Sequence, residues 1–212
     1  MIVIAIDGPA GSGKSTIARA LAARLGRDYL DTGAMYRAVT FAALRQGVDP
    51  KNGPALGDLA LRTRMTIGDQ IVVDGLDATE AIRGPEVSGL VSVVAAHPGV
   101  RSEMRRRQRL WAEEHGGGVI EGRDIGTVVF PDAPLKVYLT ARPDIRAHRR
   151  AAEVGEADED TIARWAANLA ERDHLDSTRI DSPLREASDA TVIDTSDRTI
   201  EQVIDDIVGR LT

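Results

Sequence analysis

The sequence predicts an α/β protein built on a doubly wound parallel sheet. Short apolar runs typical of buried strands alternate with segments whose apolar residues recur at helical spacing, the pattern of a parallel sheet covered by helices on both faces. At the start of the chain, a β-branched run over residues 2–6 is followed by Ile17, Leu21 and Leu25, four residues apart. A chain of 212 residues can bury one substantial core, so we expect one domain.

The remaining elements are expected in the same alternation. Further buried strands are predicted over residues 119–121, 135–139 and 191–193. Helices are predicted over residues 15–25, 34–46, 85–96, 99–115, 143–153, 161–174 and 199–211. Residues 29–33 are expected to form a linker, and a hairpin is expected over residues 65–73. Thr199 and Gln202 have the spacing of a capping box at the start of the last helix.

Composition limits the possible classes of function. A formal net charge of -6 does not suit a protein that coats a nucleic-acid backbone, and an aromatic content of 3% does not suit a stacking platform for single strands. The absence of cysteine excludes disulfides and thiolate chemistry. The apolar start of the chain stops at Asp7, well short of a signal or membrane-spanning segment. We therefore expect a cytoplasmic location and no nucleic-acid or membrane partner, and we expect a monomer.

A glycine-rich loop separates the first predicted strand from the first predicted helix. It matches G-x-x-x-x-G-K-[ST] at every fixed position, with the residues Gly8-Pro9-Ala10-Gly11-Ser12-Gly13-Lys14-Ser15. Backbone amides of such a loop, together with the positive end of the helix, bind phosphate oxygens. Lys14 can then contact the β- and γ-phosphates, and the Ser15 hydroxyl can bind Mg²⁺. We expect this loop and the adjoining Thr16 to bind a nucleoside triphosphate.

Arginine and aspartate side chains are predicted at the sheet edge where a second ligand would bind. Arg123 and Asp124 directly follow the second strand, and Arg37 lies inside the helix over residues 34–46. The carboxyl ends of strands in an open α/β sheet border the ligand site. Taken singly, such charges are usually surface ion pairs, but a kinase needs guanidinium groups for its acceptor and for the phosphoryl group in transfer. Two further sets share a helix face or a helix end, namely Arg101, Arg105 and Arg109, and Arg172, Asp176 and Arg179.

Together these segments resemble the bacterial cytidylate kinases over essentially the whole chain. The matching segments are I-D-G-P-A-G-S-G-K-S from residue 6, L-D-T-G-A-M-Y-R from residue 30, R-R-Q-R from residue 106, G-R-D-I-G-T-V-V-F-P-D-A from residue 122, R-A-H-R-R from residue 146, and R-D at 172 and 173 with Asp176 and Arg179. The segment from residue 122 is the most specific, because adenylate and shikimate kinases share the first loop but not that segment.

The resemblance implies, position by position, which side chains bind the acceptor. Counterparts of Arg37 and Arg123 hold the acceptor phosphate, and counterparts of Arg172 and Asp176 meet the sugar hydroxyls. The other residues expected to bind CMP are Thr32, Tyr36, Ser92, Arg101, Asp124 and Arg179. The carboxylate of Asp124 would accept from the cytosine amino group, whereas uracil would place a carbonyl oxygen there.

The resemblance also implies a P-loop kinase fold with two additions. Residues 49–84 would be a monophosphate-binding insertion and residues 149–160 a short lid, and the core would comprise residues 1–48, 85–148 and 161–212. The expected catalytic residues are Lys14, Arg123, Arg149 and Arg150, and Arg146 is a further lid arginine. The expected reaction transfers the γ-phosphoryl group of MgATP to CMP or dCMP, giving CDP or dCDP and ADP.

The residues alone leave other functions possible. A kinase for another small acceptor, such as UMP or a sugar acid, would carry the same first loop. A guanine-nucleotide switch would need an Asn-Lys-x-Asp motif, which the sequence lacks. The residues do not decide between CMP and dCMP or between ATP and GTP, and they do not determine the oligomeric state or which lid arginine contributes most.

Replacement of the loop lysine provides the first test. Lys14→Met should nearly abolish turnover while leaving the fold intact, because it removes the ammonium group expected at the β- and γ-phosphates without touching the core. Steady-state kinetics and circular dichroism of the variant measure both effects. Unchanged activity would overturn the assignment of the loop.

Overall fold

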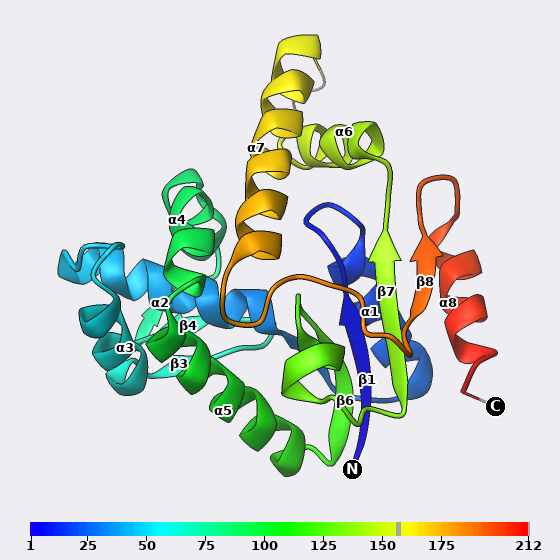
Figure 1. Ribbon diagram of the computed structural model, residues 1–212, viewed down its shortest axis with the longest axis horizontal. Coiled ribbons are helices and arrows are strands. Elements are labelled where there is room, and N and C mark those ends of the chain that lie inside the picture. The colour runs from blue at the N-terminus through cyan, green and yellow to red at the C-terminus, as the bar shows by residue number, and fades with distance from the viewer. Residues whose placement is uncertain (156–157, 212) are drawn as a thin grey trace.

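A computed structural model describes residues 1–155 and 158–211, and it confirms the α/β class. Five parallel strands form the central sheet in the order β2-β6-β1-β7-β8. Their bounds are β1 Ile2–Asp7, β2 Tyr29–Asp31, β6 Gly117–Glu121, β7 Leu135–Thr140 and β8 Thr191–Asp194. The carboxyl ends of β1, β7 and β8 point toward the same edge of the sheet, which α6 and α7 cover (Figure 1).

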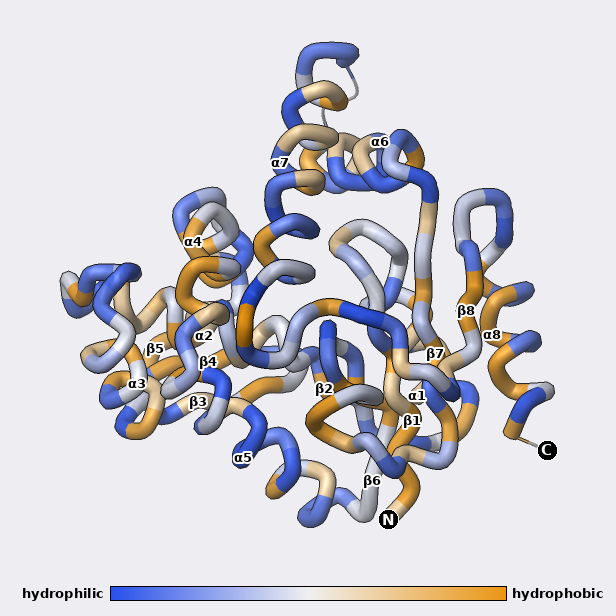
Figure 2. Tube along the Cα trace, in the orientation of Figure 1, coloured by the Kyte–Doolittle hydropathy of each residue, from blue (hydrophilic) through white to orange (hydrophobic). Residues whose placement is uncertain are grey.

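The helices lie on both faces of this sheet, as the alternating pattern predicts. Their bounds are α1 Lys14–Leu25, α2 Thr32–Gln46, α3 Gly53–Arg62, α4 Pro85–Ala95, α5 Pro98–Glu114, α6 Pro143–Glu153, α7 Glu159–Thr178 and α8 Ile200–Val208. A short 3-10 helix over Ala81–Arg83 and a π-helical turn over Ile125–Val129 complete the described helical elements. The strands β1 and β8 are mainly hydrophobic in Figure 2, whereas α5 and the tip of α7 are mainly hydrophilic.

Alternate residues of β1 belong to different halves of the core. Val3 and Ala5 pack with the apolar residues of α2, α4 and α5. Ile4 and Ile6 pack on the opposite face with those of α1 and α8. Because successive side chains of a strand point to opposite faces, one fully buried strand supplies both halves. This arrangement places the loop that follows β1 at the edge of the sheet, between the two layers of helices.

The sequence prediction missed the strand β2 and the helix α3. Residues 29–31 form the edge strand β2, paired with β6, where a linker was predicted. This prediction was wrong because a three-residue strand is too short to show a period, and its pairing is decided by β6. The helix α3 was also missed, since Pro and Gly were interpreted as breaks. Pro54 lies in the first turn, where proline is tolerated, and the Asn52 side chain caps that turn by accepting from the amide of Ala55 at 3.2 Å.

Residues 65–77 form a three-stranded antiparallel sheet rather than a simple hairpin. The strands β3 Met65–Thr66, β4 Val72–Val73 and β5 Leu76–Asp77 pair in that order. The helix α7 begins before and ends after the predicted residues 161–174. Its start is set by the Asp158 side chain, which accepts from the amide of Thr161. The capping box at the start of α8 is confirmed. Within the described residues, no helix is both long and apolar enough to span a membrane.

A close approach between β6 and the start of β1 requires glycine at position 117. A Cβ atom there would lie 2.0 Å from the carbonyl oxygen of Ile2, and the φ angle is +109°. Gly117→Ala should therefore lower the free energy of unfolding by roughly 3 kcal/mol or more. Gly116→Ala is the matched control, because its φ is +68° but no atom lies within 4 Å, and it should cost roughly 1 kcal/mol. Equal losses in urea unfolding would contradict the role of the close approach.

Candidate active site

The phosphate loop follows β1 and ends in the first turn of α1. Its entry is tight, because a Cβ atom on Gly8 would lie 2.0 Å from the carbonyl oxygen of Leu139 on β7. The buried Lys14 donates from Nζ to the carbonyl oxygen of Pro9 at 2.6 Å, so the side chain folds back over the loop. Ser15 is exposed at the helix start, and its side chain hydrogen-bonds with the buried Glu121 carboxylate. The predicted strand, loop and helix are therefore contiguous.

A set of positive side chains surrounds the phosphate loop, and we call Lys14, Arg37, Arg123, Arg150 and Arg172 the cationic cluster. Burial lowers the pKa of Lys14 well below its ordinary value, and the charges of Arg123, Arg150 and Arg172 add to the effect. Burial also lowers the pKa of Arg172 to about 10, with contributions from Arg123, Arg150 and Arg37. Five cations that repel one another in one place favour an anion between them. The cluster therefore matches a site for phosphate groups.

Carboxylates hold two of these arginines in place. Arg37 donates from Nη2 to Asp31 at 2.7 Å, and Arg123 donates from Nε to Asp176 at 2.9 Å. Asp31 also caps α2 by accepting from the amide of Ala34 at 2.9 Å. Each guanidinium group thus keeps other N–H groups for a ligand while its direction is set by one ion pair.

A second group of buried polar side chains lies beside the cationic cluster, and we call Tyr36, Arg101, Asp124 and Arg179 the base cluster. Arg101 is 1% exposed and donates from Nη2 to Asp124 at 2.6 Å, and its guanidinium carbon lies 5.4 Å from the centre of the Tyr36 ring. Arg179 Nη2 lies 3.7 Å from the other Asp124 oxygen.

The base cluster contains polar atoms without partners. The hydroxyl of Tyr36, Nε of Arg101 and Nη2 of Arg179 are buried and have no hydrogen-bond partner within the described residues. Burial raises the pKa of Tyr36 to about 12, so its hydroxyl keeps its proton and can donate. Buried donors left unpaired cost free energy, and a polar ligand would satisfy them.

The other predicted site residues lie around these two clusters. Thr32 is buried and donates from its hydroxyl to the carbonyl oxygen of Glu121 at 2.6 Å, so it joins the starts of α2 and the loop after β6. Ser92 is buried on α4, which packs against α7. Arg149 reaches the phosphate loop through Thr195, which accepts from Arg149 at 3.0 Å and donates to the carbonyl oxygen of Ser12.

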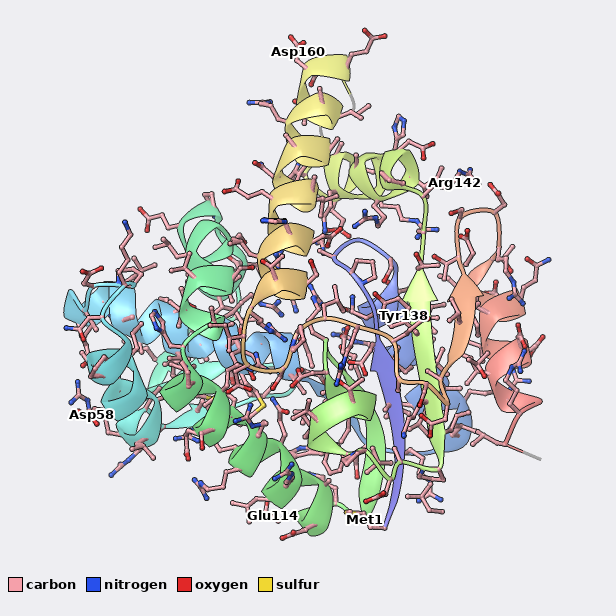
Figure 3. All side chains as sticks on the ribbon, viewed as in Figure 1. Met1, Asp58, Glu114, Tyr138, Arg142 and Asp160 are labelled. Atoms are coloured by element: carbon pink, nitrogen blue, oxygen red, sulfur yellow. The ribbon has the colours of Figure 1, made fainter. Side chains whose placement is uncertain are left out.

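Arg150 forms an ion pair with Glu153 one turn along α6, although its charge acts on the pKa of Lys14. Figure 3 places Arg142 where β7 passes into α6 and Asp160 at the far tip of α7. The predicted lid over residues 149–160 therefore spans the end of α6 and the start of α7. Residues 156 and 157 of this lid lie outside the described residues.

Comparisons with known proteins agree with this geometry. The family model described as Cytidylate kinase matches residues 4–212. This chain belongs to the cytidylate kinase family. Membership confirms the predicted family, and with it the prediction of a phosphotransferase that acts on CMP.

Individual relatives match the chain over nearly its whole length. A cytidylate kinase of Mycolicibacterium paratuberculosis is 50% identical over 96% of this chain and 92% of its own length. One of Rhodococcus opacus is 49% identical over 99% and 93%, respectively. A crystal structure of an uncharacterized protein from Eubacterium ventriosum superposes with a TM-score of 0.57 at 15% identity, covering 99% of this chain and 97% of that one. The last likeness concerns the fold alone.

Several carboxylates that lie at the site were assigned no role from the sequence. Glu121 ends β6, is buried, and has its pKa raised by burial and by Asp31, with Lys14 and hydrogen bonds from Tyr29 and Ser15 opposing the rise. An acidic residue at the carboxyl end of a buried strand, directly before the segment from residue 122, was the signal that could have identified it.

Two more carboxylates connect distant segments. Asp173 of α7 accepts from the backbone amide of Ala10 at 3.4 Å and pairs with Arg146, which also donates to the carbonyl oxygen of Ala10 at 3.1 Å. These contacts join α6 and α7 to the phosphate loop. Asp7 accepts from the amides of Ile125 at 2.9 Å and Gly126 at 2.7 Å, which holds the turn after β6.

The buried carboxyl of Asp7 gives a pH-dependent test. Burial raises its pKa from 3.8 to about 6, although the two backbone amides oppose the rise. Folding therefore favours the protonated form, and this contribution is complete below about pH 4 and lost as pH rises through about 6. Between pH 4 and 7, without nucleotide, the free energy of unfolding of the wild type should fall by up to about 3 kcal/mol relative to Asp7→Asn. Parallel profiles in denaturant titrations would show that Asp7 does not titrate there.

Proposed function

We propose that this chain transfers the γ-phosphoryl group of MgATP in line to CMP or dCMP at the cationic cluster. The observation that carries the proposal is the convergence of five cations from five separate segments, whose charges act on the pKa values of Lys14 and Arg172. No general base is required, because the phosphate oxygens of the acceptor are already nucleophilic. Catalysis then consists of positioning and of neutralising the transferred charge.

The two substrates have separate binding residues in this proposal. The triphosphate of ATP binds the loop residues and its neighbour, Gly8, Pro9, Ala10, Gly11, Ser12, Gly13, Lys14, Ser15 and Thr16. Arg37 and Arg123 bind the acceptor phosphate, since their ion pairs with Asp31 and Asp176 direct them while leaving other N–H groups available. The lid arginines Arg149 and Arg150 and the cluster cation Lys14 neutralise the phosphoryl group as it moves, together with Arg123.

The nucleoside of the acceptor occupies the base cluster. Asp124 accepts from Arg101 through one oxygen and can accept from the cytosine amino group through the other. Tyr36, Ser92 and Arg179 complete the surroundings of the base, with Thr32 beside them, and Arg172 and Asp176 bind the sugar hydroxyls. Uracil has a carbonyl oxygen in place of the amino group, so two hydrogen-bond acceptors would face each other. The unpaired donors of the base cluster support a polar ligand of this kind.

Magnesium fits the donors present near the phosphate loop. Mg²⁺ prefers oxygen ligands and usually keeps waters and substrate phosphates in its shell, so it needs few protein ligands. The Ser15 hydroxyl would bind the ion, and the Glu121 carboxylate, which hydrogen-bonds with Ser15, would bind its waters. Among the described residues, no group of three or more acidic or histidine side chains could hold a metal ion. When bound, the ion neutralises charge on the β- and γ-phosphates.

Residues 49–84, with α3 and the β3-β4-β5 sheet, would form the monophosphate-binding insertion, and residues 149–160 the lid. Their closure over bound substrates would exclude water and suppress hydrolysis of ATP. The monomeric state, the cytoplasmic location and the absence of nucleic-acid and membrane partners stay predictions.

A coupled assay with each common nucleoside monophosphate tests the proposal. ADP formation should be fastest with CMP or dCMP, and Asp124→Ala should lower kcat/KM for CMP about 100-fold while changing the KM for ATP less than twofold. The loss follows from removing the acceptor for the amino group and leaving Arg101 unpaired.

Asp189→Ala provides the matched control, because Asp189 is an exposed carboxylate that pairs with Lys136 away from the base cluster. Fastest turnover with UMP or with a non-nucleotide acceptor would contradict the proposal. Slow ATP hydrolysis unaffected by CMP would favour a nucleotide-dependent switch instead.

A further inference from the structure

The helix α5 carries three arginines four residues apart, and each leaves the helix toward a different segment. Arg101 enters the base cluster. Arg109 donates to the carbonyl oxygens of Val128 and Val129 in the π-helical turn, both at 3.0 Å. Arg105 reaches the chain that follows α7, and the proposed reaction assigns it no part.

Arg105 is tied to a turn at residues 181 and 182. Its Nη1 donates to Asp181 Oδ1 at 2.7 Å and lies 2.9 Å from the hydroxyl oxygen of Ser182. That hydroxyl donates to the same Asp181 oxygen at 2.6 Å. The side chains of Arg105 and Asp181 are 19% and 25% exposed, so water screens this pair only partly.

The turn has a strained backbone. Ser182 has a φ of +54°, in the left-handed region that side chains other than glycine rarely adopt, and it is 7% exposed. Such a conformation persists only where surrounding contacts hold it. Arg105 supplies such contacts from outside the turn, and the Asp181 carboxylate supplies one from within it. On the far side, the amide of Leu184 donates to the carbonyl oxygen of Asp176 at 2.8 Å.

The turn at residues 181 and 182 in turn orients the guanidinium group of Arg179, a member of the base cluster. Arg179 Nε donates to the carbonyl oxygen of Ser182 at 2.7 Å. Its guanidinium nitrogens lie 3.7 Å from carboxylate oxygens of Asp124 and Asp176, distances beyond a normal hydrogen bond. The Ser182 carbonyl oxygen therefore decides where the guanidinium group points.

Asp181 also faces Arg101. Its Oδ1 lies 3.8 Å from Arg101 Nε, the buried donor without a hydrogen-bond partner. Burial by itself would raise the pKa of Asp181, but hydrogen bonds from Arg105 and Ser182 hold this pKa below its usual value. The carboxylate is thus charged at neutral pH and stabilises the positive charges of Arg105 and Arg101.

We propose that Arg105 and Asp181 are positioning residues for CMP, which hold the turn at Ser182 so that Arg179 stays directed into the base cluster. This inference rests on the proposed function, because it assigns Arg179 to the acceptor. A surface ion pair of no further consequence would contribute only to stability. A positioning pair instead changes the affinity for one substrate, because the ordering of Arg179 must then be completed when CMP binds.

The test separates these two roles through the KM values for the two substrates. Arg105→Met and Asp181→Ala should each raise the KM for CMP about tenfold, with the KM for ATP changed less than twofold and kcat less than threefold. The double variant should resemble either single variant, since both changes release the same turn. In an Arg179→Met background, Arg105→Met should cause no further rise, because the residue whose direction depends on the turn is already gone.

Asp206→Ala is the matched control, since Asp206 is a partly exposed carboxylate of α8 that pairs with Arg198 at 2.8 Å. The KM of this variant for CMP should equal that of the wild type. Asp181→Asn, which keeps the side-chain shape, takes the place of Asp181→Ala if that variant does not fold.

Three results would overturn the inference: an unchanged KM for CMP with a lowered Tm, additive effects in the double variant, or a further rise in the Arg179→Met background. A wild type without CMP-dependent ADP formation would overturn the proposed function and this inference with it. A normal wild type with unaffected pair variants overturns this inference alone.

Discussion

The repulsion among the five cations of the cationic cluster is the constraint around which the site is built. Lys14 and Arg172 both hold their protons less firmly than usual because burial and neighbouring positive charges act together. Such an arrangement persists only if the fold holds it against that repulsion, and carboxylates do so at Arg37 and Arg123. Phosphate groups between the cations offset this repulsion, so the arrangement favours the binding of phosphate groups.

The parallel sheet explains why these groups meet. Asp7 and Glu121 end the neighbouring strands β1 and β6, so their carboxylates lie at one edge, next to the phosphate loop. Asp7 accepts hydrogen bonds from the first two amides of the π-helical turn, which directly follow Asp124. Arg109 of α5 donates to a carbonyl oxygen of the same turn. The residue that is proposed to read the base is therefore fixed by both the sheet and a helix.

One face of α5 carries arginines at the spacing of a solvent-exposed row, yet these side chains contact the interior of the protein. A helix with arginines at every fourth position usually presents them to water. Here Arg101, Arg105 and Arg109 each bond to a different part of the site, and Arg101 is among the largest fully buried side chains. The helix thereby sets the relative positions of the base cluster, the turn after α7 and the π-helical turn.

Local features of the sequence were sufficient for the phosphate loop, the strand and helix beside it, and the capping box of α8, because each depends on residues within a few positions of one another. The resemblance extended this to the acceptor residues, several of which the structure brings into the base cluster. The helix α3 does carry local signals, an Asn52 cap and a first-turn proline, but these were interpreted as a break. The short strand β2 and the pairing of Arg105 with Asp181, 76 residues away, were not predictable from local pattern. Such pairings form only when the packed layers bring distant segments together, because the sequence around a charged residue or a three-residue strand does not indicate which residue it will contact.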